Sequence, residues 1–442
     1  MSSSAKTQYL PLSPSARGET STGTESSNTC CSCKFCVCAA TVVVLSIALL
    51  IIYILTGEGT LAFLRPARGD LVGPHSLGSL RIRLPPAQAG AAPGLFAQVW
   101  YPADEGLPIL DAESFQWIRP EVQTRVAREY GFPENIAPAL LGGQEQLDQP
   151  SAPKAAPKDS AGWPLVIFSS GIHGSVELYT QLCRQLASFG AIVVALDYED
   201  GSGIFATNGT TGETIEYVPE PENDNVSGGE FRKLFFLEQR TKELSASVHA
   251  VLAAARGASG QGEAPLSEVL RTGDANTMVL AGHSFGATTV VRYIQLYNAT
   301  TTLRGAMLLD LWEEPLDNVT GMDVPFALLL SEEYATGSRV PGLCKLLSVN
   351  AGQSIEAVFF NGTAHEWVSE SELFAPRFVL ESLEVTGSGD YPVYIDATNR
   401  VLSLAFQVLL DPELKESLRE RVDAVDPQIV TPFACPLPGL EL

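Results

Sequence analysis

Short apolar runs alternate with stretches of helical periodicity from Pro164 onward, and this alternation constrains the fold more than any other feature of the chain. Such runs are typical of strands that are buried on both faces of a parallel sheet. They are PLVIFS (164–169), AIVVALD (191–197), TMVLAG (277–282), GAMLLD (305–310), PFALLLS (325–331) and IEAVFF (355–360). Helices are expected between them at about 176–189, 230–255 and 286–297. The pattern predicts an α/β fold with a mostly parallel, doubly wound sheet.

The N-terminal part of this domain has a different pattern. LRIRL (80–84) and LFAQVWYP (95–102) alternate apolar and polar residues, as strands of an antiparallel edge do. QPSAPKAAPKDSAGWP (149–164) has the composition of a surface loop. We expect one large domain over residues 66–442.

A nucleophile motif lies where the third apolar run meets a helix. Gly282-His283-Ser284-Phe285-Gly286 fits G-x-S-x-G. The motif alone is weak, but a nucleophile elbow requires this position between a strand and a helix, with small residues beside the serine. The alternative is an ordinary strand-to-helix turn. We expect Ser284 to be the nucleophile.

A serine hydroxyl needs a base near neutral pH, and the α/β-hydrolase order is Ser, acid, His. The chain has five histidines, namely His75, His173, His249, His283 and His365. His365 alone follows Ser284, which makes it the expected base. Asp310 ends the run GAMLLD and is the expected acid, with Glu313, Glu314 and Asp317 as nearby rivals.

The tetrahedral intermediate needs hydrogen-bond donors. The Phe285 N–H is expected to supply one, because it follows the nucleophile. Ile172, in the loop after the first apolar run, is expected to supply the second, since Gly171 allows close approach; the alternative is a plain glycine turn. No metal and no cofactor are expected.

The N-terminal 65 residues contain an uncharged segment. Residues 1–34 are rich in Ser and Thr and are expected to form a disordered tail. No charged residue occurs over 35–57, which as a helix would be about 34 Å long and able to cross a hydrocarbon core of about 30 Å. This predicts a retained transmembrane signal anchor; the alternative is a cleaved signal peptide.

The positions of the cysteines and asparagines also bear on membrane attachment and on glycosylation. Five cysteines cluster before the apolar segment: Cys30, Cys31, Cys33, Cys36 and Cys38. S-acylation is favoured over a zinc site, because no second ligand pair is present; unmodified thiols are the other alternative. Five asparagines begin N-x-S/T sequons: Asn208, Asn225, Asn298, Asn318 and Asn361. We therefore expect a glycosylated, single-pass membrane protein with a lumenal or extracellular catalytic domain. Cys344 and Cys435 are able to pair.

The net charge of −23 excludes nucleic acid as an expected partner, because a nucleic-acid binder needs a basic surface. The acidic surface is also repelled by anionic lipid, so membrane attachment depends on the N-terminal helix. Oligomeric state has no signal in this sequence.

Several segments together resemble the platelet-activating factor acetylhydrolase family, in its plasma and type II intracellular forms. They include VWYPAD, PLVIFSSGIHGS, LEQRTKEL, LAGHSFGATT, GAMLLDLWEEPL and NGTAHEWV, in family order over about residues 70–410. The resemblance implies the α/β-hydrolase fold and calcium-independent cleavage of short or oxidised sn-2 acyl groups from phospholipids. It places the nucleophile, acid and base on Ser284, Asp310 and His365, and the oxyanion donors on Ile172 and Phe285.

The chain departs from the family pattern at two positions near the site. The family's His-Gly-Leu-Gly loop is Ser170-Gly171-Ile172-His173 here, and its second glycine after the elbow is Ala287. Both changes keep the backbone donors but can reshape the acyl pocket. The acidic loop 201–229 either covers the site or is a disordered insertion.

Three hypotheses follow. The leading one is an esterase that acts on phospholipids of the platelet-activating factor type. The first alternative is a general carboxylesterase, or a polyester or dienelactone hydrolase, on the same fold. The second is a catalytically inactive hydrolase fold used as a binding module; the presence of Ser284, Asp310 and His365 argues against it.

Overall fold

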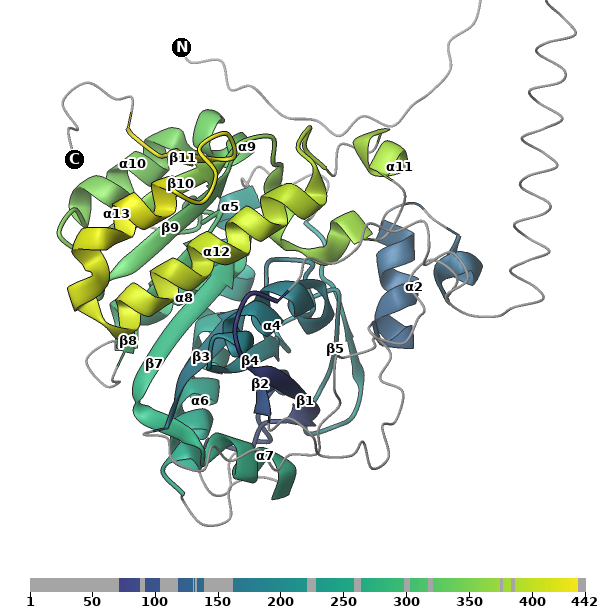
Figure 1. The fold of residues 1–442 in the computed structure, drawn as a ribbon. Coiled ribbons are helices and arrows are strands. Elements are labelled where there is room, and N and C mark those ends of the chain that lie inside the picture. Colours follow the sequence, from purple (N-terminus) through teal and green to yellow (C-terminus); the bar gives the residue numbers. More distant parts are fainter. Residues whose placement is uncertain are drawn as a thin grey trace, which may run out of the picture. The chain divides into compact units, whose positions relative to one another are not determined.

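The structure is a computed structural model of the chain (Figure 1). It describes residues 71–87, 92–103, 118–129, 131, 133–138, 162–220, 228–257, 264–297, 303–316, 321–373, 377–382 and 386–435. All of them lie in the larger of two units into which the chain divides, Thr56–Leu442. The predicted tail (1–34), the predicted membrane segment (35–57) and the cysteine cluster lie outside the described residues.

A nine-stranded sheet runs through this unit in the order β1-β2-β4-β3-β7-β8-β9-β10-β11. The strands from β4 to β10 in that order are parallel, whereas β1, β2 and β11 are antiparallel to their neighbours. Their bounds are β1 Ser76–Arg83, β2 Phe96–Ala103, β3 Trp163–Ser169, β4 Ile192–Asp197, β7 Gly273–His283, β8 Leu303–Leu309, β9 Phe326–Ser331, β10 Ser354–Phe360 and β11 Val430–Pro432. The predicted α/β sheet and its antiparallel edge are confirmed.

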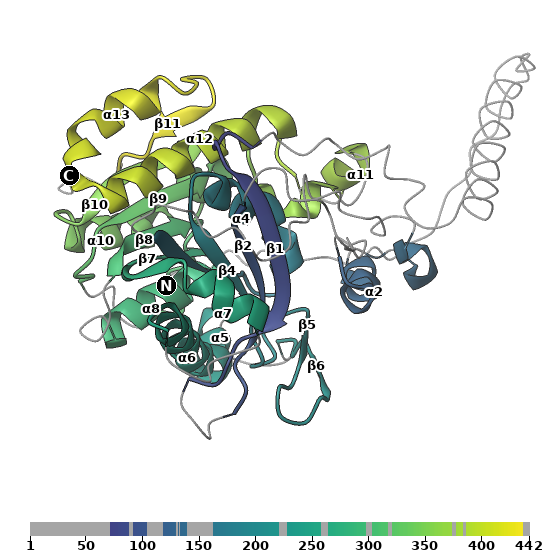
Figure 2. The same ribbon diagram turned by 60° about the horizontal axis from the view of Figure 1, so that its bottom comes forward.

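Helices cover both faces of the sheet (Figure 2). One layer contains α6 Glu238–Ala255, α7 Ala264–Leu270, α8 Phe285–Tyr297 and α10 Val340–Val349. The other contains α4 Thr180–Ser188, α12 Tyr391–Leu410 and α13 Lys415–Asp423. The other α-helices and strands of the described residues are α2 Pro120–Glu129, α5 Gly228–Arg232, α9 Glu332–Thr336, α11 Arg377–Ser382 and a hairpin of β5 Phe205–Thr207 and β6 Thr214–Glu216.

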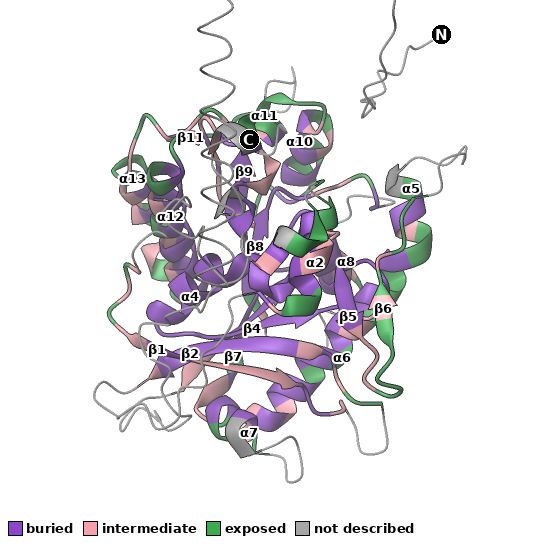
Figure 3. Ribbon diagram, turned by 90° about the vertical axis from the view of Figure 1, so that its right-hand side faces the viewer, coloured by how far each residue is buried: buried purple, intermediate pink, exposed green. Residues whose placement is uncertain are grey.

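The central strands are buried on both faces (Figure 3). In β3, Leu165 and Ile167 pack into one core, whereas Val166 and Phe168 pack into the other. This follows from the two-residue period of a strand, which sends successive side chains to opposite faces. The continuous apolar runs of the sequence therefore fill two cores at once.

The strand order reverses beside β3, which determines where a ligand can bind. The chain passes from β3 to β4 on one side and then returns to β7 on the other side. In open α/β sheets, ligands bind at such a switch point, outside the carboxyl ends of the strands. The loop after β3 and the turn after β7 meet there.

Two parts of the fold differ from the sequence prediction. The helix expected over 230–255 contains a π-helical segment, Lys233–Leu237, between α5 and α6. The C-terminal elements α12, α13 and β11 were not predicted; α12 is a 20-residue helix that packs across β8 and β10.

The predicted location, a single-pass membrane protein with a lumenal or extracellular catalytic domain, is wrong. Within the residues that the structure describes, no helix is both long enough and apolar enough to cross a membrane. The longest, α12, has the length, but Asp396, Asn399 and Arg400 interrupt its apolar residues.

A disulfide links α10 to the segment after β11. Cys344 and Cys435 are bonded, with their Cα atoms 5.5 Å apart and a sequence separation of 91. The pairing that the sequence allowed is therefore present. Closing a loop of this size stabilises a fold by about 4–5 kcal/mol in the chain-entropy account.

A buried ionic cluster fastens α2 to the end of β4. Arg119, which precedes α2, forms ion pairs with Glu177 and Asp197, whose side chains are 0% and 2% exposed. Burial opposes the ionisation of Glu177, but the charge of Arg119 outweighs it and lowers the pKa of that carboxyl. Burial raises the pKa of Asp197. The Arg119 guanidinium is thus the shared counter-ion of two buried carboxyl groups.

We expect Arg119→Met to destabilise the fold by about 3–5 kcal/mol, because it leaves two buried carboxyl groups without their counter-ion. The matched control is Arg128→Met on α2, whose partner Glu134 is half exposed and whose loss should cost less than about 1 kcal/mol. Urea unfolding measures both variants. Equal midpoints would contradict this account of the cluster.

Candidate active site

Ser284 lies in a strained turn between β7 and α8. Its φ of 55° is in the left-handed region, and its side chain is buried. The neighbouring glycines are required by contact: a Cβ on Gly286 would lie 2.0 Å from the Ser169 carbonyl oxygen, and one on Gly282 would lie 2.6 Å from the Gly286 carbonyl. The backbone N–H of Ser284 donates to the Leu309 carbonyl at 2.9 Å. The motif therefore has the tight strand-to-helix geometry that a nucleophile elbow requires.

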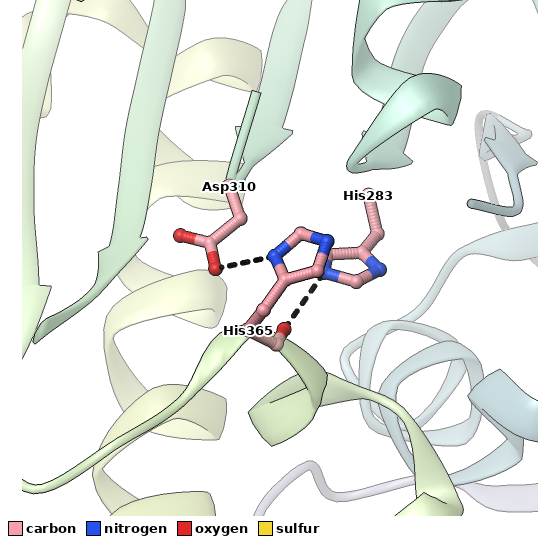
Figure 4. Close-up of side chains that lie close together, drawn as sticks. All are labelled: His283, Asp310 and His365. Atoms are coloured by element: carbon pink, nitrogen blue, oxygen red, sulfur yellow. Dashed lines mark hydrogen bonds and ion pairs between the residues drawn. The ribbon is translucent and has the colours of Figure 1, made fainter. Parts of the chain in front are cut away.

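His365 lies beyond β10 and bridges two other predicted site residues. Its Nε2 is 2.9 Å from Ser284 Oγ, and its Nδ1 is 3.0 Å from Asp310 Oδ2 (Figure 4 shows the second contact). With Nδ1–H donating to the carboxylate, Nε2 is free to accept the serine proton. The residues predicted as nucleophile, base and acid are thus within hydrogen-bonding reach in the order that acyl transfer needs.

Asp310 is held by more than the histidine. It follows β8, has a φ of 42°, and is fully buried. Its Oδ1 accepts the Ser331 N–H at 2.6 Å, and its Oδ2 accepts the Ser331 hydroxyl at 2.7 Å. Ser331 also caps α9 by accepting from the Tyr334 N–H. Together with the bond from His365, Asp310 accepts three hydrogen bonds and donates none, which suits an ionised carboxylate.

Of the rival acids, Glu314 is engaged elsewhere. Glu314 accepts from Trp312 Nε1 and forms an ion pair with Arg339 at 3.0 Å. Glu313 packs against Gly342, and Asp317 lies outside the described residues. Within the described part of the chain, Asp310 is the carboxylate that contacts the His365 ring.

Two aromatic rings hold the imidazole of His365. The Tyr334 ring is stacked on it, with centroids 4.5 Å apart and planes within 6°. The His283 ring lies 4.7 Å away at 33°. Neither contact was predicted from the sequence, because both depend on how β7, α9 and the loop after β10 pack together.

Burial and hydrogen bonding shift the pKa of His365 in opposite directions. Burial disfavours the charged imidazolium, but the hydrogen bond and charge of Asp310 outweigh it, so the pKa of His365 is raised above 6.5. Burial raises the pKa of Asp310 against the hydrogen bonds it accepts. Burial lowers the pKa of His283 well below 6.5, so this ring is neutral.

We expect kcat/KM for an activated ester to increase with pH through a midpoint above 6.5, since only neutral His365 can accept a proton. Glu366→Gln should move the midpoint to lower pH, because the Glu366 charge also raises the pKa of His365. The measurement is a pH–rate profile over about pH 5–9. A rate that does not increase with pH over this range would contradict the assignment of His365 as base, and a midpoint at or below 6.5 would contradict its raised pKa.

The two predicted oxyanion donors come from adjacent strands. Ile172 lies in the loop after β3, Phe285 follows Ser284 after β7, and these strands pair in register at Ser169 and Gly282. Among the described residues, neither backbone N–H donates a hydrogen bond to another protein group. Two unpaired donors beside a serine hydroxyl form a suitable site for an oxyanion.

Part of the loop 201–229 contacts this oxyanion loop. The His173 N–H donates to the Ser202 carbonyl at 2.8 Å, and the Tyr217 ring lies 3.5 Å from the His173 ring, centroid to centroid. His173 has a positive φ of 59° and also pairs with Glu129 of α2. Residues 201–206 are therefore packed structure, whereas most of residues 210–220, which include the second strand of the β5–β6 hairpin, are exposed.

Donor atoms of His283, Asp310 and His365 lie within 4.8 Å of one another, as a metal site would require (Figure 4). However, both nitrogens of His283 have hydrogen-bond partners, Tyr179 Oη and the His365 carbonyl. His365 and Asp310 are bonded to each other. The donor set therefore fits a hydrogen-bonded catalytic group better than a metal centre.

Comparisons with known proteins identify relatives of this chain. The family described as platelet-activating factor acetylhydrolase, isoform II, matches residues 70–423. A platelet-activating factor acetylhydrolase of Gallus gallus is 22% identical over 81% of this chain and 87% of its own length. One of Canis lupus familiaris is 23% identical over 71% of each chain.

A solved structure is similar in fold. The ferulic acid esterase of Streptomyces cinnamoneus superimposes with a TM-score of 0.53 at 19% identity, covering 78% of this chain and 96% of its own. This similarity supports the α/β-hydrolase fold.

Proposed function

This chain belongs to the platelet-activating factor acetylhydrolase family, isoform II, and is an ester hydrolase; we propose that it cleaves short or oxidised sn-2 acyl groups from phospholipids. The observation that carries the proposal is the chain of hydrogen bonds from Ser284 through His365 to Asp310 beside two unpaired N–H donors. The substrate class is supported by the names of the family and of the relatives from Gallus gallus and Canis lupus familiaris.

In the proposed acylation step, His365 Nε2 takes the Ser284 proton as Oγ attacks the ester carbonyl. The carbonyl oxygen becomes an oxyanion, which accepts hydrogen bonds from the Ile172 and Phe285 N–H groups. Asp310 stabilises the imidazolium through Nδ1–H. The intermediate then expels the lysophospholipid alkoxide, which receives its proton from His365, and the acyl group remains on Ser284.

Deacylation repeats this chemistry with water. His365 Nε2 takes a proton from a water molecule, which attacks the acyl-enzyme, and the same two N–H groups hold the second oxyanion. Collapse returns the proton to Ser284 Oγ and releases the acid. This route activates both nucleophiles by a base and therefore requires no calcium.

The test is hydrolysis of three substrates by the full chain, with and without a calcium chelator. They are a phospholipid with sn-2 acetyl, one with sn-2 oleoyl, and nitrophenyl acetate. We expect the acetyl lipid to be cleaved much faster than the oleoyl lipid, with no effect of the chelator. Cleavage of nitrophenyl acetate alone would overturn the substrate class and favour a general carboxylesterase.

A further inference from the structure

A fully buried arginine lies directly behind the oxyanion loop. Arg240, on α6, has no solvent exposure. Its Nη2 donates to the Ser170 carbonyl at 2.9 Å and contacts the Gly171 carbonyl at 3.4 Å. The guanidinium carbon lies 4.0 Å from the Tyr198 ring centroid and 5.2 Å from that of Phe285. One side chain thus contacts both segments that carry the oxyanion donors.

Burying a guanidinium destabilises a fold unless its partners compensate, because desolvation of a charge costs several kcal/mol. Arg240 has no carboxylate partner among the described residues; its acceptors are the two carbonyls and Ser170 Oγ. Its charge is therefore held by neutral acceptors. A positive charge in this position is stabilised further when negative charge forms on the other side of the loop.

The direction of the Ile172 N–H follows from these contacts. In a trans peptide, the carbonyl of one residue and the N–H of the next point in opposite directions. The Gly171 carbonyl is held by the Gly174 N–H at 3.2 Å and by Arg240. The Ile172 N–H, in the same peptide, must therefore point away from Arg240.

The preceding peptide is held from both sides. Its Ser170 carbonyl accepts from Arg240, and its Gly171 N–H donates to Tyr179 Oη at 3.1 Å. The Tyr179 hydroxyl then donates to His283 Nδ1 at 3.0 Å, since His283 Nε2–H donates to the His365 carbonyl at 3.0 Å. A carbonyl can only accept, which fixes the proton on Nε2. The hydrogen bonds thus connect the oxyanion loop with the backbone of the base.

We propose that Arg240 and Tyr179 are positioning residues that grip the Ser170–Gly171 peptide from opposite sides and thereby aim the Ile172 N–H at the oxyanion. The proposal rests on the proposed function, because it assigns these residues to the transition state of ester hydrolysis. Their effect appears when negative charge develops on the substrate. It is small for the bound ester, because the ground-state carbonyl carries little charge.

The experiment compares Tyr179→Phe and Arg240→Met with the unmodified chain. Two controls match them: Tyr293→Phe, at a buried tyrosine of α8, and Arg292→Gln, in a surface pair with Glu238 of α6. The readouts are kcat/KM for nitrophenyl acetate and affinity for two inhibitors. One is an alkyl trifluoromethyl ketone, which adds to the serine and forms an oxyanion. The other is an sn-2 ether phospholipid, which does neither.

We expect kcat/KM to fall about 10- to 100-fold in Tyr179→Phe and about 100- to 1000-fold in Arg240→Met, near the cost of losing one oxyanion donor. Trifluoromethyl ketone affinity should fall by the same factors, whereas ether lipid affinity stays within about twofold. Equal losses for both inhibitors, or unchanged kcat/KM in Tyr179→Phe, would overturn the proposal. Circular dichroism first shows which variants fold; Tyr179→Phe is nearly isosteric and decides the matter if Arg240→Met does not.

The same measurements separate this proposal from the proposed function. If the unmodified chain hydrolyses no ester and binds no trifluoromethyl ketone, the proposed function fails and the positioning proposal fails with it. If the unmodified chain is active and the two variants behave like their controls, the positioning proposal alone is wrong.

Discussion

Ser284→Ala should reduce kcat for ester hydrolysis by about 10⁶, because removing the nucleophile leaves only the binding site and the oxyanion donors. The loss should be the same for nitrophenyl acetate and for an sn-2 acetyl phospholipid, since both form their acyl-enzyme on the same oxygen. KM should change little. Stability should also change little, because the left-handed φ of 55° is a strain that the wild-type serine already bears.

The control for this variant is Ser417→Ala on α13, whose hydroxyl bonds the Leu414 carbonyl far from the elbow in sequence and layer. Ser417→Ala should retain full activity. Residual activity in Ser284→Ala above about 1% of the unmodified rate would mean that another group acts as nucleophile.

Asp310→Asn should reduce kcat by about 10⁴ while the protein stays folded. The Ser331 N–H, which donates to Oδ1 at 2.6 Å, can still donate to the amide oxygen, whereas the Ser331 hydroxyl, 2.7 Å from the Oδ2 position, then faces the amide NH₂ and can accept from it. The amide then directs its NH₂ group toward His365 Nδ1, so the imidazole adopts the tautomer with its proton on Nε2. That tautomer cannot accept the serine proton.

Matched variants test the choice of acid. Glu313→Gln and Glu314→Gln should keep activity within a few-fold of the unmodified enzyme, because neither carboxylate contacts His365. Steady-state kinetics on the three variants give the result. If a glutamate variant loses activity and Asp310→Asn does not, the acid is assigned to the wrong residue.

The sequence allowed most of the fold to be predicted, because strands buried on both faces leave continuous apolar runs. It did not predict α12, α13 or β11, which follow the last of those runs. It also did not predict the π-helical segment before α6, whose residues are compatible with an ordinary helix. The family resemblance, drawn from motifs such as GHSFG and NGTAHEWV, is confirmed by the match over residues 70–423.

The site residues on strand ends were accessible to sequence reasoning, whereas those on other elements were not. His365 was the one histidine after Ser284, and Asp310 ended a predicted strand. Ser331 also ends a predicted strand and lies at the same edge, so its contact with Asp310 could have been expected. Tyr179, Arg240 and Tyr334 carry no comparable signal, because only the packing of α6, α9 and the Val176–Tyr179 turn brings them to the site.

In the proposed mechanism Ser284 forms the acyl-enzyme, and covalent labelling is a direct test of this role. The full chain is treated with a fluorophosphonate and digested, and the modified peptide is sequenced by mass spectrometry. We expect one adduct, on Ser284, whose formation slows as pH falls through the pKa of His365. No adduct, or an adduct on a different residue, would contradict it.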